Sequence, residues 1–149
     1  ISVEAAAALI PDVPDRYAKL LEGQDGSTRH PDLTWSVGAY VCHVGDNLRI
    51  FAERMWSAVE AKQVHIEGYD QDDLASVRKY EYIPLDTALW SLSHAAGMWY
   101  EAYEAALGRE ATFNHSERGL QTLSDIVQPA VHDAKHHEWD IRRSLAVQE

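Results

Sequence analysis

The sequence has few of the features that would connect it with disulfides, membranes or nucleic acids. Cys42 is its one cysteine, so no internal disulfide can form, and we expect a reducing, cytoplasmic location. No apolar run approaches the roughly 18–20 residues that span a bilayer. Lysine and arginine total 13 against 24 acidic residues, a formal net charge of −11. Such a field repels phosphate groups, so we expect neither nucleic acid nor a membrane as a partner.

One domain is the simplest organisation for a chain of this size. Hydrophobic residues make up 46% and charged residues 25%, ordinary values for a globular protein, and no repeat, low-complexity tract or linker divides the sequence. Residues 1–10 are apolar but include Glu4 and have no basic leading region, so they do not resemble a signal peptide. We expect a single soluble domain over residues 1–149.

Apolar residues recur every three or four positions over most of the chain, a pattern typical of amphipathic helices. A short helix is predicted over residues 12–22, closed by Gly23, and a loop is predicted over 24–34. The pattern fails over residues 63–83, where acidic side chains gather. A connection of that length in a compact domain is usually functional or carries a short helix of its own.

Three longer helices account for the rest of the chain. The second begins at Ser36, a plausible N-cap, and the third follows Pro84 and ends near Gly108. The last begins at Thr122, with Asp125 three residues later as a capping-box partner. Four amphipathic helices and no convincing strand predict an all-α fold, a four-helix bundle with a short crossover segment.

Histidines on the second and last helices could bind a metal ion. The last helix offers two pairs at spacing i, i+4, His132 with His136 and Asp133 with His137. Residues at that spacing lie one above the other on a helix, so either pair could hold one ion. His43 on the second helix would complete a three-ligand site with open positions, the arrangement of catalytic metals. By spacing alone, a solvated helix face explains either pair as well as a metal site does.

The apolar stripe of the last helix favours one pair over the other. At 100° per residue, Asp133 and His137 fall nearer the stripe than His132 and His136, which point away from it. Pro129 lies inside this helix and should kink it, which disturbs the phase. The phase therefore indicates Asp133 and His137 as the inward pair, with His132 and His136 as the alternative.

Three segments resemble one known family. Residues 35–43, Trp-Ser-Val-Gly-Ala-Tyr-Val-Cys-His, followed by Asp46, resemble the second-helix signature of the DinB/YfiT-like superfamily. Residues 137–142, His-Glu-Trp-Asp-Ile-Arg, resemble the ending of its mycothiol-dependent maleylpyruvate isomerase branch. Residues 69–72, Tyr-Asp-Gln-Asp, are similar to a Trp-Asp-Gln-Asp element of actinobacterial members. The matches occur in the family's order and reach from residue 35 to 142.

The resemblance implies a four-helix bundle with a divalent metal in a crevice at one end. In the family, a histidine on the second helix and a His-x-x-x-His or Glu-x-x-x-His pair on the last helix bind the ion. The register implies His43, Asp133 and His137 here, with Asp133 standing where histidine or glutamate is usual. Zinc is the first expectation for this ligand set, and nickel, iron or manganese also suit it.

The resemblance also implies a function. Family members use the metal to activate low-molecular-weight thiols such as mycothiol or bacillithiol, which predicts a thiol S-transferase or a thiol-dependent isomerase acting on a small-molecule substrate. A metal-dependent hydrolase is the alternative, and Asp70 or Glu138 would have to be its general base. A non-catalytic metal- or ligand-binding stress or accessory protein, able to form a homodimer, is a third interpretation, favoured by the unusual Asp133.

Weaker candidates accompany these ligands. The resemblance implies that Tyr69 or Asp70 lines the crevice, although a solvated turn is the simpler interpretation. Arg142 could hold an anionic group of the substrate, or it could pair with Asp140 or Glu138. We expect the Cys42 thiol to be packed rather than nucleophilic.

Overall fold

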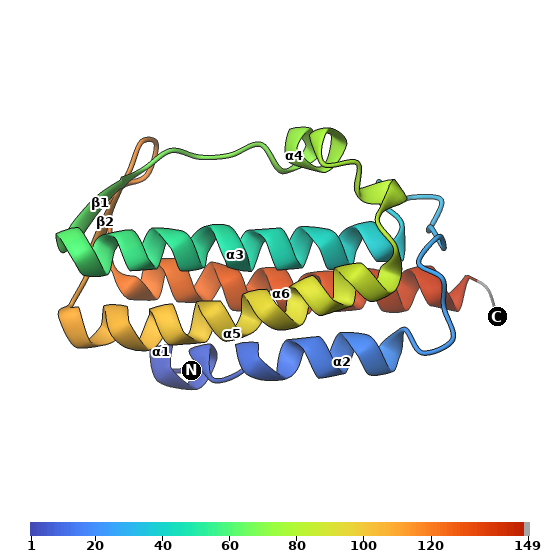
Figure 1. Cartoon of the computed structure of the whole chain (residues 1–149), viewed down its shortest axis with the longest axis horizontal. Coiled ribbons are helices and arrows are strands. Elements are labelled where there is room, and N and C mark those ends of the chain that lie inside the picture. The colour runs from blue at the N-terminus through green and yellow to red at the C-terminus, as the bar shows by residue number, and fades with distance from the viewer. Residues whose placement is uncertain (148–149) are drawn as a thin grey trace.

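Four helical segments run side by side along the long axis of the computed structural model, which describes residues 1–147 (Figure 1). The predicted all-α bundle is therefore confirmed. None of the helices in these residues is both long and apolar enough to cross a membrane. The four segments are α1 (Val3–Ala7) continued by a 3-10 turn (Ile10–Asp12) and α2 (Val13–Leu20), then α3 (Val37–Ala61), α5 (Leu85–Arg109) and α6 (Leu123–Ala146).

The long helices begin at the residues that the sequence predicts. The Ser36 hydroxyl caps α3 by accepting a hydrogen bond of 3.2 Å from the backbone N–H of Ala39. Thr122 and Asp125 form the predicted capping box at the start of α6, where the Asp125 carboxylate accepts from the Thr122 backbone N–H at 2.8 Å. The helix continues through Pro129 to Ala146.

A crossover of residues 62–84 connects α3 to α5. It carries β1 (Gln63–Ile66), α4 (Gln71–Val77) and a 3-10 turn (Tyr80–Tyr82). The predicted crossover segment is confirmed, and it carries a short helix, one of the two alternatives that its length left open. The crossover returns the chain to the end of the bundle where α3 began (Figure 1). As a result α3 and α5 run in the same direction, and both end beside β1.

A small sheet at that end corrects one expectation. The sequence predicts no strand, but β1 pairs in parallel with β2 (Thr112–His115), which pairs antiparallel with β3 (Gly119–Gln121). Strands of three or four residues are too short to show a period-two pattern. They pair because α3 and α5 end together, so that the segments after them meet: the Thr112 N–H donates to the Lys62 carbonyl at 3.1 Å.

The interior between the helices is mainly apolar, with Trp99, Leu48 and Ile141 among its fully buried side chains. A few polar side chains are buried with them, and these need internal partners because water cannot reach them. Two of them, His43 on α3 and Asp140 on α6, belong to the cluster described next.

Candidate metal centre

His43 is buried near the start of α3. Only 2% of its surface is exposed, and the Trp35 ring packs against the imidazole at a centroid distance of 5.1 Å. A polar ring in such a place needs a hydrogen-bond partner to offset the loss of water. Its Nε2 lies 3.2 Å from Oδ1 of Asp133, a residue 90 positions away on α6. This contact directs His43 at the last helix.

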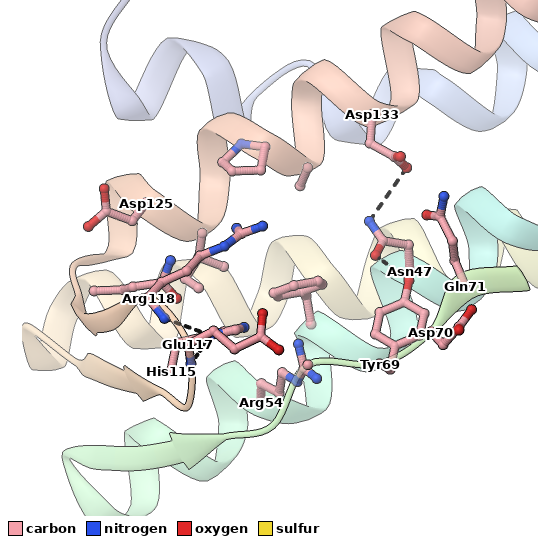
Figure 2. Close-up of a pocket in the computed structure, with 16 residues that line it drawn as sticks. Asn47, Arg54, Tyr69, Asp70, Gln71, His115, Glu117, Arg118, Asp125 and Asp133 are labelled. Atoms are coloured by element: carbon pink, nitrogen blue, oxygen red, sulfur yellow. Dashed lines mark hydrogen bonds between the residues drawn. The ribbon is translucent and has the colours of Figure 1, made fainter. Parts of the chain in front are cut away.

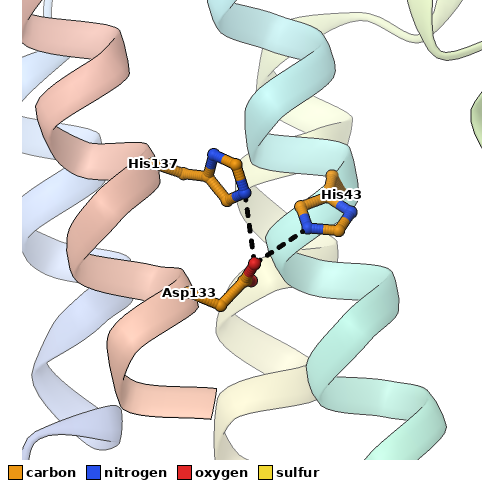
Figure 3. Close-up of side chains that lie close together, drawn as sticks. All are labelled: His43, Asp133 and His137. Carbon is orange, nitrogen blue, oxygen red and sulfur yellow. Dashed lines mark hydrogen bonds and ion pairs between the residues drawn. The ribbon is translucent and has the colours of Figure 1, made fainter. Parts of the chain in front are cut away.

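Asp133 and His137 lie one turn apart on α6 and face α3 (Figure 3). His137 Nε2 is 3.1 Å from the same Asp133 Oδ1 that His43 contacts. The Tyr40 ring stacks on the His137 imidazole at 5.0 Å, and this restricts its rotation. Two imidazole nitrogens and one carboxylate oxygen therefore converge from two helices.

The spacing of these three groups fits a divalent ion. One ligand atom from each residue lies within 4.8 Å of the others, and the two Nε2–Oδ1 distances are 3.1 and 3.2 Å. An ion about 2.1 Å from each ligand needs tetrahedral neighbours about 3.4 Å apart. Within residues 1–147 no other group of three such side chains is placed to hold a metal. The cluster is a candidate site for one divalent metal with open positions.

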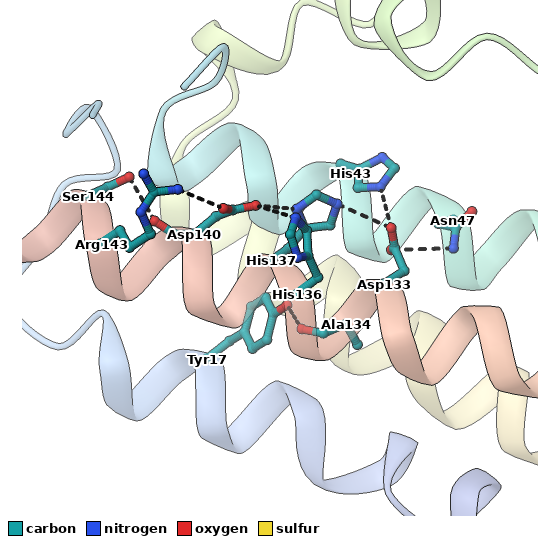
Figure 4. Close-up of polar contacts among 10 residues, drawn as sticks. All are labelled: Tyr17, His43, Asn47, Asp133, Ala134, His136, His137, Asp140, Arg143 and Ser144. Atoms are coloured by element: carbon teal, nitrogen blue, oxygen red, sulfur yellow. Dashed lines mark hydrogen bonds and ion pairs between the residues drawn. The ribbon is translucent and has the colours of Figure 1, made fainter. Parts of the chain in front are cut away.

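Asp140 supports the cluster from behind. The residue is 4% exposed, and its Oδ2 lies 3.1 Å from His137 Nδ1 (Figure 4). A proton on Nδ1, donated to this carboxylate, leaves the Nε2 lone pair available to a metal. Asp140 also contacts Arg143 at 3.8 Å, which offsets part of its buried charge. The residue therefore sets both the orientation and the tautomer of His137.

Asn47 and Tyr69 hold the other side of Asp133. The Asn47 amide donates to Asp133 Oδ2 at 3.5 Å, and the Tyr69 hydroxyl donates to Asn47 Oδ1 at 2.6 Å. This chain of hydrogen bonds links α3, the crossover and α6. It keeps Oδ1 of Asp133 turned toward the two histidines.

The charges of the cluster are strongly coupled. Burial raises the pKa of the Asp133 carboxyl, but hydrogen bonds from His137 and His43 outweigh it and hold that pKa well below its usual range. Burial lowers the pKa of His137, but hydrogen bonds and attraction to Asp133 and Asp140 raise it above its ordinary value. Without a metal, these contacts favour the protonated form of His137 more than in a free imidazole, and an ion at Nε2 competes with that proton.

Two cavities open beside the cluster. Asp133 lines a cavity of about 580 Å³ that also contains Asn47 and Tyr69 (Figure 2). His137 lines a second cavity of about 350 Å³, and Gln71 borders both. Ligands of the size of small metabolites could therefore reach the cluster, the larger space lying on the Asp133 side.

A search of solved structures finds a protein with the same architecture. YfiT from Bacillus subtilis, described as "a probable metal-dependent hydrolase with an unusual four-helix bundle topology", superposes with a TM-score of 0.82 over 99% of this chain and 90% of that chain, at 19% sequence identity. This chain has the YfiT fold. No protein-family model matches the sequence, and no curated protein matches it significantly. The resemblance inferred from the sequence is thus supported at the level of the fold.

On this YfiT-like bundle, the two pairs of the last helix lie on different faces. Asp133 and His137 point inward with His43, as the apolar stripe predicts, whereas His132 and His136 are exposed. That His43, Asp133 and His137 bind a metal remains a prediction. Tyr69 and Asp70 both line the larger cavity.

Arg142 and Glu138 lie away from the cluster. Arg142 is 3.7 Å from Glu138 and is not among the residues lining either cavity beside the metal ligands, so it fits the ion pair that the sequence left open rather than a substrate anchor there. Glu138 also forms two hydrogen bonds with Arg16, of 3.0 and 3.1 Å. Burial raises the pKa of Cys42 to about 12, consistent with a packed thiol.

Asp140 and Asn47 are the supporting residues that sequence reasoning missed. Asp140 appeared only as an ion-pair partner, although its position three residues after His137 puts both on one face of the helix. Asn47 stands four residues after His43, also on one face. A search for polar residues one turn from each ligand would have found both.

Proposed function

We propose that the chain is a metal-dependent enzyme in which His43, Asp133 and His137 hold one divalent ion. The observation that supports this most is the convergence of the two Nε2 atoms and Oδ1 of Asp133 within 4.8 Å of one another, beside a cavity that a substrate could enter. A divalent ion there, zinc in the first place, would lower the pKa of a thiol or water in its open positions.

The nucleophile that we propose is a low-molecular-weight thiol such as mycothiol or bacillithiol. The S–H bond breaks and its proton leaves to solvent. The thiolate sulfur then adds to an electrophilic carbon–carbon double bond, whose π bond breaks, and the neighbouring carbon takes up a proton from solvent. A free thiol with a pKa near 8.5 is only a few per cent ionised at pH 7, so ionisation alone contributes roughly tens-fold and positioning in the cavity the rest. A thiolate needs no general base at the moment of attack, and Glu138, one of the two bases considered, is engaged with Arg16.

Hydrolysis is the second candidate, and one observation favours it. Asp70 lines the same cavity as Asp133, and YfiT, which shares the fold, is described as "a probable metal-dependent hydrolase". Only Oδ1 of Asp70 is used to cap α4, where it accepts from the backbone N–H groups of Asp72 and Asp73 at 3.0 Å. Its other oxygen could accept a proton from an attacking water.

The first experiment measures metal content and thiol binding. The purified protein should contain about one divalent ion per chain. Cobalt-substituted protein, titrated with mycothiol, bacillithiol, glutathione and cysteine, should develop a sulfur-to-cobalt charge-transfer band with at least one of them. His43→Ala should lose both the ion and the band. Metal retained in stoichiometric amount by that variant would overturn the site.

The second experiment separates the two nucleophiles. Turnover of a generic electrophile, with and without thiol, is compared between wild type and Asp70→Asn. Thiol transfer predicts thiol-dependent turnover that survives Asp70→Asn. Hydrolysis predicts thiol-independent turnover of an ester that Asp70→Asn reduces by about 100-fold or more, the usual contribution of a general base. If no thiol produces a charge-transfer band and turnover does not depend on thiol, thiol transfer is wrong and hydrolysis becomes the proposed function.

A further inference from the structure

The arginines of this acidic chain are mostly paired. Six form ion pairs with carboxylates: Arg16, Arg29, Arg49, Arg78, Arg142 and Arg143. Arg54, Arg109 and Arg118 have no carboxylate within ion-pair distance in residues 1–147. Two of these three, Arg54 and Arg118, line the 580 Å³ cavity next to Asp133. In a chain of net charge −11 this placement calls for an explanation.

Arg54 is a partly buried cation. Its guanidinium lies 4.7 Å above the Phe51 ring and donates one hydrogen bond of 2.6 Å to the Glu67 carbonyl. Burial lowers the pKa of Arg54, because its charge has lost part of its hydration. A guanidinium has five N–H donors, so a single carbonyl leaves most of them for another acceptor. An anion in the cavity would offset the lost hydration.

His115 adds a donor on the β2–β3 hairpin. Its Nδ1 accepts hydrogen bonds from the backbone N–H groups of Glu117 and Arg118, at 3.1 and 3.2 Å. A neutral imidazole that accepts at Nδ1 carries its proton on Nε2. The same turn that fixes His115 also presents Arg118, whose exposed side chain lines the cavity (Figure 2).

Most carboxylates of the cavity have other roles. Asp125 belongs to the capping box of α6, Asp70 caps α4, and Asp133 faces the two histidines. Glu117 is exposed on the hairpin, and its carboxylate is not within ion-pair distance of Arg54 or Arg118. Figure 2 shows Arg118, Glu117 and His115 gathered at one end of the cavity, apart from Asp133 and Asn47. One end of the cavity therefore carries Arg118 and His115 beside Glu117 and Asp125, and the other end carries the proposed metal ligand Asp133.

We propose that Arg54, Arg118 and the Nε2–H of His115 bind an anionic group, a carboxylate or a phosphate, of a small-molecule substrate. The reactive end of that substrate extends toward Asp133. The assignment rests on the proposed function for the role of Asp133, whereas the anion subsite itself needs no metal. Guanidinium groups recognise carboxylate and phosphate alike, through paired N–H donors.

The test is a titration of the ¹⁵N-labelled protein, residues 1–149, by heteronuclear NMR. Succinate and inorganic phosphate are compared with succinamide, which matches succinate in shape but has no charge. We expect saturable shifts at the amides of Glu117 and Arg118 with an anion and none with succinamide. Tighter binding of phosphate than of succinate would assign a phosphate-bearing substrate, and the reverse order a carboxylate.

Variants locate the subsite. Arg118→Gln changes an exposed side chain and should weaken anion binding about tenfold or more, while Arg54→Lys should retain more of the affinity than Arg54→Gln. Arg109→Gln is the matched control, because Arg109 is also unpaired but does not line the cavity, and it should bind like wild type. Glu117→Gln should bind anions more tightly, since it removes a competing negative charge.

A last comparison separates this proposal from the metal site. His43→Ala should bind succinate or phosphate at the hairpin as wild type does, even if it carries no metal. Equal binding of succinate and succinamide, or unchanged anion affinity in both Arg118→Gln and Arg54→Gln, would overturn the subsite. Loss of the metal without loss of anion binding would support the anion subsite as a separate site.

Discussion

Two faces of α6 carry pairs of side chains with the same spacing and opposite surroundings. His132 and His136 are exposed, their rings stacked at a centroid distance of 6.0 Å. Asp133 and His137, each one position further along, meet His43 in the interior. One residue rotates a side chain by about 100° around the helix. The i, i+4 spacing is therefore a necessary feature of such a site, but the face of the helix decides whether a third ligand can reach it.

The two pairs also differ in their support. His137 has Tyr40 stacked on its ring and Asp140 on its Nδ1, at 5.0 and 3.1 Å. His136 approaches Asp140 only at 3.5 Å from an exposed position. A ligand held in one rotamer and one tautomer loses less entropy when it binds an ion. The comparison predicts a graded series of effects on the two faces.

The largest effect is expected from His137→Ala, which should abolish stoichiometric metal binding, because it removes one of three ligands. The control is the double variant His132→Gln with His136→Gln, which should retain metal near the wild-type level. Metal analysis of the purified proteins decides between them. The reverse result, metal lost from the double variant and kept by His137→Ala, would show that the outer face binds the ion.

Asp140→Asn should weaken metal affinity about 10- to 100-fold, the usual cost of losing a carboxylate that orients a histidine ligand. Chelator competition measures this change. His136→Gln removes the longer of the two histidine contacts to Asp140 and should leave the affinity unchanged. Equal losses in the two variants would mean that Asp140 acts through the surface pair rather than through His137.

A smaller effect is expected on the pH dependence of stability in the metal-free protein. Asp133 has a lowered pKa, so its stabilising contribution is present above its ordinary value of 3.8 and disappears as the pH falls through the folded-state pKa. His137 has a raised pKa, so its contribution is present below 6.5 and disappears as the pH rises through the folded-state value. In chelator-treated protein, the cluster should therefore contribute most to the free energy of unfolding between about pH 4 and 6.5.

With added zinc, the stability of the protein should no longer fall as the pH rises above about 6.5. The ion competes with protons for the histidines and therefore binds better at higher pH. Urea unfolding at several pH values, with and without zinc, measures both trends. In metal-free Asp133→Asn, the free energy of unfolding should depend less on pH than in the metal-free wild type. A stability of the metal-free protein that rises steadily from pH 6 to 8 would contradict the coupling of His137 to Asp133.

The smallest effect is expected at the outer pair itself. Replacing His132 and His136 together by glutamine should change the free energy of unfolding by no more than about 0.5 kcal/mol, as is usual for exposed positions. Tyr17→Phe on the inner side gives the contrast. It removes the hydroxyl that donates to the Ala134 carbonyl at 2.5 Å and should cost about 1 kcal/mol. Chemical denaturation of both variants tests the pair of expectations.

Local signals were sufficient for much of this molecule. Ser36 and Thr122 mark helix starts because a side-chain oxygen and the following N–H groups are neighbours in sequence. The phase of α6 could be read because burial of an apolar stripe repeats with the helical period, and this separated Asp133 and His137 from their exposed neighbours. The three short strands gave no such signal, since their pairing depends on where α3 and α5 end.

The sequence by itself determined the three long helices, the caps at Ser36 and Thr122 and the residues of α6 that face inward, because these depend on neighbours within one or two turns. It gave no signal for α1 (Val3–Ala7). Only the tertiary structure decided that His43 meets Asp133 across 90 residues and that Asp140 lies behind His137 at 3.1 Å. It also decided that Arg54 of α3 and Arg118 of the hairpin share one cavity. Such meetings depend on helix packing and on the path of the crossover, and no local pattern encodes the distance between two elements that are far apart in the chain.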